Sequence, residues 1–534
     1  MARISQEQKY RRRWWTLGVL SLSLVIIGLD NTILNVAIPT LQTELNASAS
    51  QLQWMVDSYV LVFAGTLLTM GALGDRFGRA RFLSAGLVVF GLSSAYAAFT
   101  STAAELIAAR AIMGIGAAMI MPATLSIITD IFPREERGRA IGIWAAVAGL
   151  GIGLGPIFGG LLLENFFWGS VFLVNVPIVI SALVLGYFLV PASRDPEATP
   201  LDLKGAFTSL VAITAVVFGI IEGPAEGWTS PLVVAAFVVA AVFGAAFIWI
   251  ERSVEHPMLN LDYFRNPRFS GGATAISIAF FSLFGVIFLL TQYLQFVLGY
   301  SALEAGVRTA PVALGMVIGS AMSPRLAERF GTAKVVAFGL FVLSATLVSF
   351  TFFGVATGYA VIGLSIVAMA FGMGNIMAPS TDAVMGAVPV AKAGVASATN
   401  DVTRQVAGAV GVAVIGSVFN SAYQANMEPF VAQLPPEAAE AASNSIGAAL
   451  QIAAQLPGQA GEALITAARQ GFVDAMGIAI WIPVVVAFFA AFVVLRFLPA
   501  QHLPAVDEPS AAPTTPESVA YETGRDDALS SPQR

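Results

Sequence analysis

The chain has 534 residues, of which 57% are hydrophobic and 11% are charged, with a formal net charge of −6. Soluble globular domains carry about 25% charged residues, so this composition excludes a water-soluble protein and is typical of a polytopic membrane protein. The absence of cysteine excludes disulfides, thiolate metal sites and cysteine nucleophiles. The only histidines, His256 and His502, cannot form a metal cluster or a triad. The charges lie between apolar runs, so the net charge does not indicate nucleic acid binding.

Apolar runs along the chain predict the membrane spans. The first run, 15–38, is predicted to be a span and not a cleaved signal peptide, because it is longer than a signal h-region and lacks a clear cleavage site. Thirteen further runs follow, each long enough to cross a bilayer. The fourteen predicted spans are 15–38, 52–74, 81–99, 103–127, 138–162, 170–190, 204–222, 231–250, 270–292, 304–327, 333–353, 358–387, 393–421 and 472–497.

The distribution of basic residues predicts which side of the membrane each connector occupies. With an even number of spans, both termini lie on the same side. Placing them in the cytoplasm puts nearly all of the 27 Lys and Arg residues in cytoplasmic segments, as the positive-inside rule requires. Arg308 and Arg469 then lie outside, and Arg110 and Arg404 fall within spans. We therefore expect a multi-pass protein of the cell membrane with both termini in the cytoplasm.

An internal repeat organises the spans. The sequence Asp75–Gly78 (DRFG) after the second span reappears as Glu328–Gly331 (ERFG) after the tenth. The sequences 133–142 (PREERGRAIG) and 389–398 (PVAKAGVASA) align in the same way. Spans 1–6 therefore correspond to spans 9–14, with spans 7 and 8 inserted between them. The predicted fold is an all-α polytopic membrane protein of two pseudo-symmetric six-helix bundles plus two inserted helices, and transporters of this kind bind substrate between the halves.

The predicted domain organisation follows from the repeat and from composition. Alanine-rich stretches at 435–455 and 461–469 predict short helices in an external hairpin, and the Pro-, Ser-, Thr- and acid-rich end of the chain predicts disorder. The predicted parts are a cytoplasmic N-terminus (1–14), an N-terminal six-helix bundle (15–190), a linker with spans 7 and 8 (191–269), a C-terminal six-helix bundle (270–497) with the external hairpin (423–471), and a disordered cytoplasmic tail (498–534).

Four motifs lie within the first five spans and the loop after the second. They are Leu29–Pro39 (LDNTILNVAIP), Gly71–Arg79 (GALGDRFGR), Arg110 with Gly114 and Gly116, and Gly149–Gly160 (GLGIGLGPIFGG). Through these motifs the chain resembles the fourteen-span drug:proton antiporters of the major facilitator superfamily, over nearly everything except the tail. The resemblance implies export of drugs in exchange for protons, with no cofactor.

The loop after the second span is the predicted cytoplasmic gate. A tight turn with charges of both signs suits a switchable network, and the resemblance implies that its ion pairs stabilise the outward-facing state. Asp130 and the arginines within 134–139 are possible partners on the same face. The alternative is that the loop arginines act only as topology anchors. The residues assigned to the gate turn are Gly71, Asp75, Arg76, Gly78 and Arg79.

The glycines of the fifth span have two interpretations. A phosphate-binding loop requires a preceding strand, whereas these glycines lie inside an apolar helix, so nucleotide binding is disfavoured. The spacing of Gly151, Gly155 and Gly159 favours close helix packing. Pro156 removes a backbone hydrogen bond and is expected to bend the helix. The resemblance implies that this bend helps to seal the two bundles and favours antiport over leak.

Ionisable residues inside the spans are candidates for the transport machinery, because such residues normally face a cavity or a partner. From the helix rise, Asp30 lies roughly 13 Å, Asp57 roughly 8 Å and Arg110 roughly 10 Å from the outer ends of their spans. An aspartate balanced between burial and an arginine can load a proton on one side and release it on the other. We predict Asp30 first and Asp57 second as proton- or substrate-binding acids, with Arg110 tuning one of them. The alternative is a static Asp–Arg packing pair.

Spans 7, 12 and 13 carry further acids. Asp382 is the predicted coupling acid of the second bundle, because Lys392 is its only local basic partner. Asp401 and Arg404 lie three residues apart on one helix face and can simply pair with each other. Glu222 ends the seventh span and is more typical of an interfacial residue.

Polar and aromatic residues near these acids are candidates to line the path. An aromatic cavity with one or two acids suits flat lipophilic cations through hydrophobic and cation–π attraction. The candidates are Asn31, Asn35, Trp54, Tyr59, Trp144, Phe281, Phe284, Gln292, Tyr293 and Gln295.

The sequence therefore favours a proton-driven exporter of lipophilic, cationic compounds. The sequence contains no zinc protease motif, nucleophile elbow or Walker A motif, which disfavours an enzyme or an ATP-driven pump. An uptake symporter conflicts with the fifth-span motif. The alternative is the same antiport mechanism dedicated to an endogenous lipid, siderophore or metabolite. We expect a monomer whose partners are small substrates, protons and the bilayer, without metal or nucleic acid.

Overall fold

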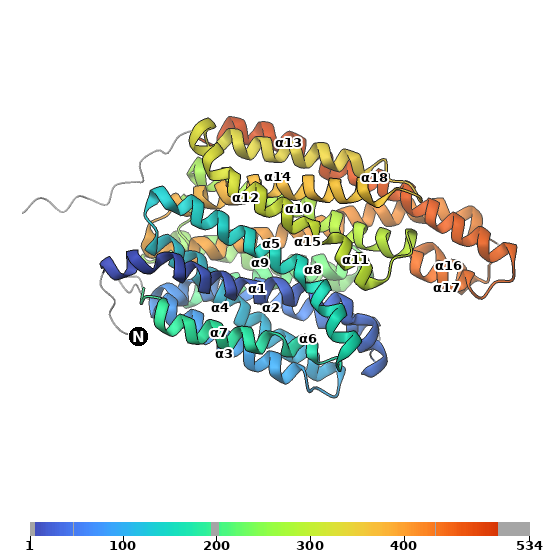
Figure 1. Cartoon of the computed structure of the whole chain (residues 1–534), viewed down its shortest axis with the longest axis horizontal. Helices are drawn as coiled ribbons and strands as arrows, with labels where there is room; N and C mark the ends of the chain where they lie inside the picture. Colours follow the sequence, from blue (N-terminus) through green and yellow to red (C-terminus); the bar gives the residue numbers. More distant parts are fainter. Residues whose placement is uncertain (1–5, 46, 48, 194–201, 433, 500–534) are drawn as a thin grey trace, which may run out of the picture. The chain divides into compact units, whose positions relative to one another are not determined.

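The computed structural model describes residues 6–45, 47, 49–193, 202–432 and 434–499. The predicted disordered tail lies outside this range from residue 500 onward. The described residues form helices and connectors with no strand among them, as the sequence predicted (Figure 1). Fourteen helical segments of the described chain are long and apolar enough to cross a membrane, which confirms the predicted number of spans.

The helices follow the order of the predicted spans. The first half contains α1 (Gln6–Glu44), α2 (Ala49–Phe77), α3 (Arg79–Ala97), α4 (Ala103–Ile131), α5 (Arg134–Asn165), α6 (Ser170–Leu173) and α7 (Asn175–Leu189). The inserted helices are α8 (Leu203–Glu226) and α9 (Pro231–Ser253). The second half contains η1 (Leu261–Arg265), α10 (Pro267–Gln292), η2 (Tyr293–Val297), α11 (Ala302–Thr309), α12 (Pro311–Phe330), α13 (Thr332–Phe350), α14 (Tyr359–Gly386), η3 (Val390–Lys392), α15 (Ala393–Val431), α16 (Pro436–Asn444), α17 (Ile446–Ala453) and α18 (Gln459–Phe497).

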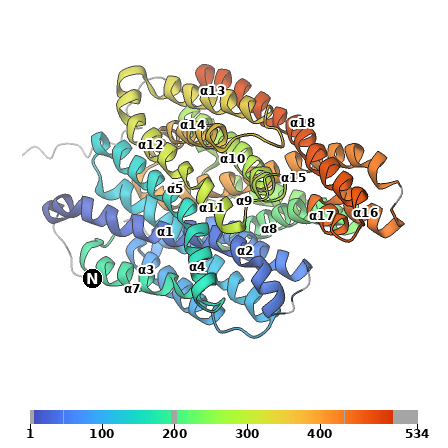
Figure 2. The ribbon, with the colours of Figure 1, turned by 45° about the vertical axis from the view of Figure 1, so that its right-hand side comes forward.

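The two halves repeat one packing pattern. In the first half α1 packs on α5, and both α2 and α3 pack on α4. In the second half α10 packs on α15, and both α12 and α13 pack on α14. The halves meet along two seams, α5 with α12 and α2 with α15, and Figure 2 shows α5 and α12 side by side. The described helices thus have the predicted architecture of two related bundles.

The opposite ends of the helices are named here by what they carry. The basic end, on the left in Figure 1, holds the start of α1 and the arginine-containing turns between α2 and α3 and between α4 and α5. The hairpin end, on the right, holds α16 and α17. These names are used below without reference to a membrane side.

Two predicted spans are interrupted in the structure. The sixth span consists of α6 and α7, and the tenth consists of α11 and α12. Pro311 stands at the start of α12, where its missing N–H removes no helical hydrogen bond. The Ser301 side chain and Glu304 form a capping box that starts α11. A hydropathy run cannot detect such breaks, because the apolar composition continues through them.

The external hairpin is built on two long helices. Helices α15 and α18 each have 39 residues. A helix of that length extends about 58 Å, nearly twice the hydrocarbon core of about 30 Å, so both project beyond the membrane at the hairpin end. The predicted short helices are present as α16 and α17, but the prediction of a separate one at 461–469 is wrong. That stretch belongs to α18, which begins after Gly458 and has no break there.

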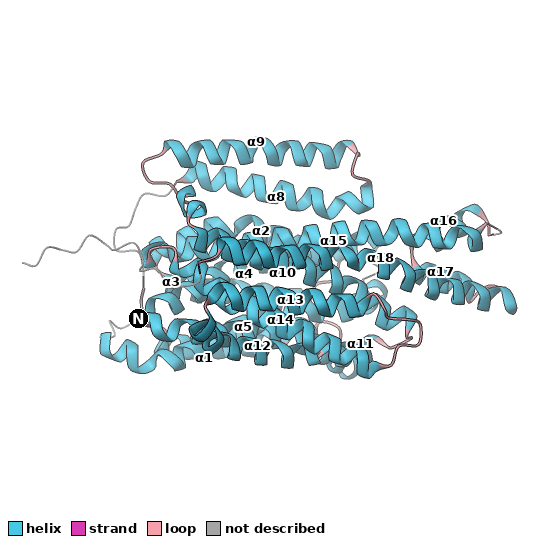
Figure 3. Cartoon of the chain, turned by 90° about the horizontal axis from the view of Figure 1, so that it is seen from above, coloured by secondary structure: helices cyan, strands magenta, loops and turns pink. Residues whose placement is uncertain are grey.

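The inserted helices form a layer of their own beside the bundles (Figure 3). Helix α8 packs along α2 and also contacts α15, so it covers the seam between the two halves. A Cβ at Gly65 of α2 would collide with the Thr214 hydroxyl of α8, and the rings of Trp54 and Phe218 lie 6.1 Å apart. Helix α9 packs on α8 and exposes most of its apolar side chains.

The repeated turn explains why its glycine occurs in both halves. Gly78 after α2 has φ 109° and Gly331 after α12 has φ 88°. Side chains with a Cβ rarely adopt such values, whereas glycine does so at little cost. Each glycine ends one helix and begins the next, which places the charged residue pairs before it at the basic end.

Candidate functional site

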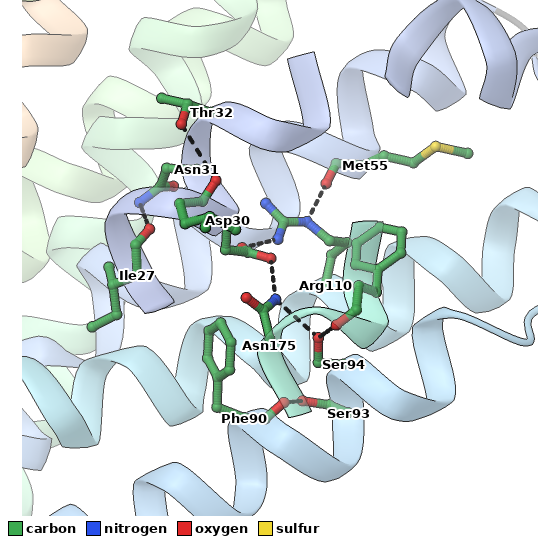
Figure 4. Close-up of polar contacts among 12 residues, drawn as sticks. Ile27, Asp30, Asn31, Thr32, Met55, Phe90, Ser93, Ser94, Arg110 and Asn175 are labelled. Carbon is green, nitrogen blue, oxygen red and sulfur yellow. Dashed lines mark hydrogen bonds and ion pairs between the residues drawn. The ribbon is translucent and has the colours of Figure 1, made fainter. Parts of the chain in front are cut away.

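The centre of the first bundle contains a buried ion pair between α1 and α4. Arg110 donates from Nη1 to Asp30 Oδ2 at 2.5 Å (Figure 4). The Asp30 side chain is 0% exposed and that of Arg110 is 1% exposed, so water screens neither charge. Removing one partner of such a pair leaves an uncompensated buried charge, at a cost of about 3–5 kcal/mol.

Asn175 completes the polar shell of Asp30. Its Nδ2 donates to Asp30 Oδ1 at 3.2 Å and to Ser94 Oγ at 3.1 Å, and the residue is completely buried. Both carboxylate oxygens of Asp30 are therefore hydrogen-bonded by other helices. The sequence analysis missed Asn175, although an amide between Val174 and Val176 in an apolar span was a usable signal.

Arg110 is held in place by further groups of α2. Its Nε donates to the Met55 carbonyl at 3.0 Å, and its guanidinium carbon lies 4.3 Å from the centre of the Tyr59 ring. Tyr59 is 0% exposed. A cation over an aromatic face gains electrostatic attraction, most of all where both are desolvated. Helices α1, α2, α4 and α7 thus all contribute to the surroundings of one carboxylate.

Asp57 lies in a different environment from Asp30. It is half-buried on α2, near Gln53 of the same helix and Glu222 of the inserted helix α8. The similar depth predicted for Asp57 therefore does not bring it into the Asp30–Arg110 pair. Glu222 is half-buried in the last turns of α8, close to Asp57.

The predicted gate turn connects the two bundles at the basic end. Asp75 accepts from Arg79 Nε at 2.8 Å and from the backbone N–H groups of Gly394 and Val395 at 3.1 and 3.2 Å. These two N–H groups belong to the first turn of α15, where the helix dipole favours a negative charge. The Asp75 carboxylate therefore caps a helix of the opposite bundle.

Arg79 makes a second connection between the bundles. Its Nη2 donates to the carbonyls of Val390 and Ala391 at 2.5 and 3.1 Å, and its Nη1 donates to Ser193 at 3.1 Å. The side chain is 2% exposed. Asp75 and Arg79 together close the seam between α2 and α15 at this end.

Other residues assigned to the gate have secondary positions. A Cβ at Gly71 would lie 2.7 Å from the Ala398 side chain and from the Gly394 carbonyl, so the glycine permits the close approach of α2 and α15. Arg76 lies over the Phe77 ring. Arg137, one of the predicted partner arginines, donates to the Thr129 carbonyl at 2.9 Å.

Further charged residues lie at the same end of the helices. Asp130 is half-buried at the end of α4. Arg139 lies 5.0 Å from the Trp14 ring, and Arg13 forms an ion pair with Glu136 at 2.6 Å. The side chain of Arg134 is outside the described part of the structure.

The glycines of α5 form two packing faces. A Cβ at Gly151 would lie 3.2 Å from Gly28 of α1, and one at Gly155 would collide with the Thr32 hydroxyl. Gly159 faces α1 in the same way. Close packing of α5 on α1 therefore accounts for all three motif glycines, and the Pro156 side chain lies outside the described part.

A second set of glycines faces the other bundle. Added Cβ atoms at Gly142 and Gly149 would lie 2.8 and 2.7 Å from Ser320 and Met316 of α12. A Cβ at Gly153 would reach the Ala313 side chain at 3.5 Å. The glycines of α5 thus let this helix pack closely on α1 and on α12 at once, along the seam between α5 and α12.

The acids of the second bundle are dispersed. Asp401 pairs with Arg404 at 2.8 Å on α15, with side chains 0% and 7% exposed. The Arg404 guanidinium also lies 5.0 Å from the Phe280 ring of α10. Asp382 is half-buried on α14 and is not part of that pair. The described residues contain no group of three or more His, Cys, Asp or Glu able to hold a metal ion.

Four of the ten predicted path-lining residues donate hydrogen bonds within their own half of the chain. Trp144 is buried and donates to Thr124 Oγ1 at 3.2 Å, and Tyr293 donates to the Gly354 carbonyl at 2.8 Å near the hairpin end. Asn31 is exposed and Gln292 is half-buried, and each donates to a carbonyl of its own helix. The Asn35 side chain lies outside the described part.

Comparisons with known proteins agree with this arrangement. The sequence profile described as Major Facilitator Superfamily matches residues 20–412. The multidrug efflux pump LfrA of Mycolicibacterium smegmatis is 38% identical, over 86% of this chain and 91% of that protein. The methyl viologen resistance protein SmvA of Salmonella typhimurium is 36% identical, over 88% of this chain and 95% of that protein.

Similarity to solved structures concerns the fold. The crystal structure of the human organic anion transporter MFSD10 superposes with a TM-score of 0.57. The match covers 90% of this chain and 99% of that one, at 16% sequence identity. At this level of identity the two proteins share the arrangement of helices.

Proposed function

Because the chain belongs to the Major Facilitator Superfamily, we propose that it is a proton-coupled antiporter that exports lipophilic, cationic drugs by alternating access. The observation that carries this proposal is the buried Asp30–Arg110 ion pair, whose carboxylate also accepts from Asn175. Buried charges inside a membrane are costly and mark ion or proton pathways. The export mechanism needs such a group, because proton flow has to be linked to substrate movement.

The geometry around Asp30 supports a switch between two states. With Asp30 ionised, Arg110 is neutralised and α4 is tied to α1 at 2.5 Å. When Asp30 takes up a proton, the attraction disappears and Arg110 keeps only its Met55 and Tyr59 contacts. A cationic substrate can compete for the same carboxylate, which links the two fluxes directly.

The closed seam at Asp75 supports alternating access. In the proposed orientation the protein lies in the cell membrane. Its basic end then faces the cytoplasm, in accordance with the positive-inside rule. The hydrogen bonds from α15 to Asp75 then close the cytoplasmic side and favour an outward-facing state. Inward opening requires Asp75 and Arg79 to release α15 and η3.

The relatives support the substrate class. LfrA is named as a multidrug efflux pump, and SmvA is named for resistance to methyl viologen, which is a flat dication. Flat cations are attracted by carboxylates and by aromatic faces. Both kinds of group occur where α2 meets α8. Asp57 and Glu222 are half-buried carboxylates there, and Trp54 and Phe218 provide aromatic rings beside them.

Asp30→Asn in everted membrane vesicles tests the proposal. Substrate uptake is followed by ethidium fluorescence, and proton exchange by the response of a pH-sensitive dye when substrate is added. We expect Asp30→Asn to abolish the proton response and active ethidium uptake, while the exposed Glu328→Gln variant retains both. Normal proton-coupled transport by Asp30→Asn would refute the role of this carboxylate. Coupled transport of neutral endogenous compounds but not of cations would favour a dedicated metabolite exporter.

A further inference from the structure

Two carboxylates meet where the inserted helices reach the basic end. Asp202 precedes α8, and its Oδ1 accepts from the Gly205 backbone N–H at 2.8 Å. Glu251 lies in the last turn of α9, and its Oε2 accepts from the Leu259 backbone N–H at 3.0 Å. Each carboxylate therefore uses one oxygen for a structural hydrogen bond.

The other oxygen of each carboxylate is buried and has no hydrogen-bond partner among the described residues. These atoms are Asp202 Oδ2 and Glu251 Oε1. Glu251 is only 4% exposed. A Cβ added at Gly205 would lie 2.5 Å from the first oxygen and 2.7 Å from the second, so both converge on the same small space. Glycine leaves that space free.

The described charged residues around this space pair elsewhere or are exposed. Neither free oxygen accepts a hydrogen bond from a cationic side chain of the described residues. Asp262 and Arg265 of η1 pair with each other at 3.2 Å and are exposed. The charged residues beside this end of α8 and α9 are exposed as well: Lys204, Arg252, Glu255 and His256. The half-buried Glu222 and the exposed Glu226 lie at the opposite end of α8.

Two facing carboxylates in a dry space cannot both remain ionised, because their repulsion is unscreened and neither is compensated. One proton between them removes the repulsion and forms a strong O–H···O⁻ hydrogen bond. A metal ion is a poorer occupant, since Mg²⁺ usually keeps several water ligands and Glu251 is nearly inaccessible. We propose that Asp202 and Glu251 together form a proton-binding site that latches the inserted helices to the seam between α2 and α15.

The latch acts through the connector that follows α9. Glu251 holds the Leu259 amide, and the neighbouring Met258 packs with Leu68 of α2 and Ala398 of α15. Ala398 also faces Gly71, next to the Asp75 gate. The connector therefore bridges both bundles at the seam that has to open at this end, and that consequence rests on the proposed function.

Loss of the shared proton weakens the latch. With both carboxylates ionised, repulsion and hydration separate Asp202 from Glu251 and loosen the bond to Leu259. Met258 is then released from the seam. Since an antiporter brings protons into the cytoplasm, a latch that closes when protons accumulate there would slow further turnover.

The chain has no native cysteine, so one introduced thiol reports on the seam. Met258 is 9% exposed, so a Met258→Cys thiol is shielded when the latch is closed, and Ser253→Cys at an exposed position is the reference. In everted vesicles the medium sets the pH at the cytoplasmic face, and the ratio of maleimide labelling rates at the two positions reports opening. We expect this ratio to rise by about tenfold between about pH 6 and pH 9. A tenfold change is expected if the pKa of the shared proton differs by about one unit between the closed and the open latch.

The labelling rate also depends on pH because the thiols ionise. Variants of the two carboxylates, made in the same Met258→Cys and Ser253→Cys proteins, separate that effect from the effect of the proton site. Glu251→Gln can donate an amide hydrogen to Asp202 and still accept from Leu259, so its ratio should stay low across the pH range. Asp202→Asn should likewise flatten the profile, whereas the exposed Glu255→Gln should keep the original one. Retention of the full pH response in both Glu251→Gln and Asp202→Asn would overturn the proposal.

A cation in place of the proton gives a different result. Titration with MgCl₂ and then EDTA at constant pH should leave the labelling ratio unchanged if the occupant is a proton. Opening on chelation would overturn the assignment. Neither measurement depends on transport, so a failure of the latch and a failure of the proposed antiport are distinguishable.

Discussion

Replacement of Asp75 by asparagine tests the gate most directly, because it preserves the shape of the side chain and removes its charge. The carboxylate accepts from Gly394, Val395 and Arg79, and all three bonds stabilise the closed seam. An amide has one acceptor oxygen, so at least one backbone N–H of α15 loses its partner. Hydrogen bonds to charged groups contribute about 1.5–3 kcal/mol each, and the helix dipole adds about 0.3–1 kcal/mol.

The expected loss is therefore about 3 kcal/mol of preference for the closed state, which corresponds to about a hundredfold change in the ratio of closed to open molecules. Spin labels at Phe77→Cys and Val390→Cys, both exposed positions on opposite sides of the seam, measure its width by double electron–electron resonance. We expect one short distance in the parent protein and a dominant longer distance in Asp75→Asn.

The repeat provides a matched control for this measurement. Glu328 occupies the position of Asp75 in the second half but is exposed. Glu328→Gln should leave the distance distribution unchanged. An unchanged distribution in Asp75→Asn as well would show that the α15 hydrogen bonds do not hold the seam, and would refute the reasoning.

Two further predictions concern packing inside the first bundle, and both are measured by thermal unfolding of the purified protein. Arg110→Met should lower the free energy of unfolding by about 3–5 kcal/mol, because the Asp30 carboxylate remains buried without its cationic partner. The double variant with Asp30→Asn should recover part of this loss. No recovery would mean that the unpaired charge is not the cause of the destabilisation. Gly155→Ala should destabilise by about 1–3 kcal/mol through its collision with α1. Gly138→Ala, which meets nothing within 4 Å, is the control, and equal losses at both glycines would argue against tight packing.

The sequence by itself determined the number of spans, the repeat and the position of the charged turn. Each of these depends on local composition: a bilayer requires about 20 apolar residues per helix, and a turn with φ near 100° requires glycine. Gly78 and Gly331 could therefore be recognised from their motif alone. Asp30 and Arg110 were also recognisable, because a charge inside an apolar run is conspicuous.

The tertiary structure decided which of these groups meet. Helix rise predicts the depth of a residue in the membrane, but the direction of its side chain depends on the rotation and packing of the helix. Asp30 and Asp57 are therefore predicted at similar depths, yet the described ion pair of Arg110 is with Asp30. Asn175 was conspicuous as an amide in an apolar span, but its contact with Asp30 depends on how α7 packs on α1. Asp75 binds backbone N–H groups 319 and 320 residues away, and backbone donors leave no signature in a sequence.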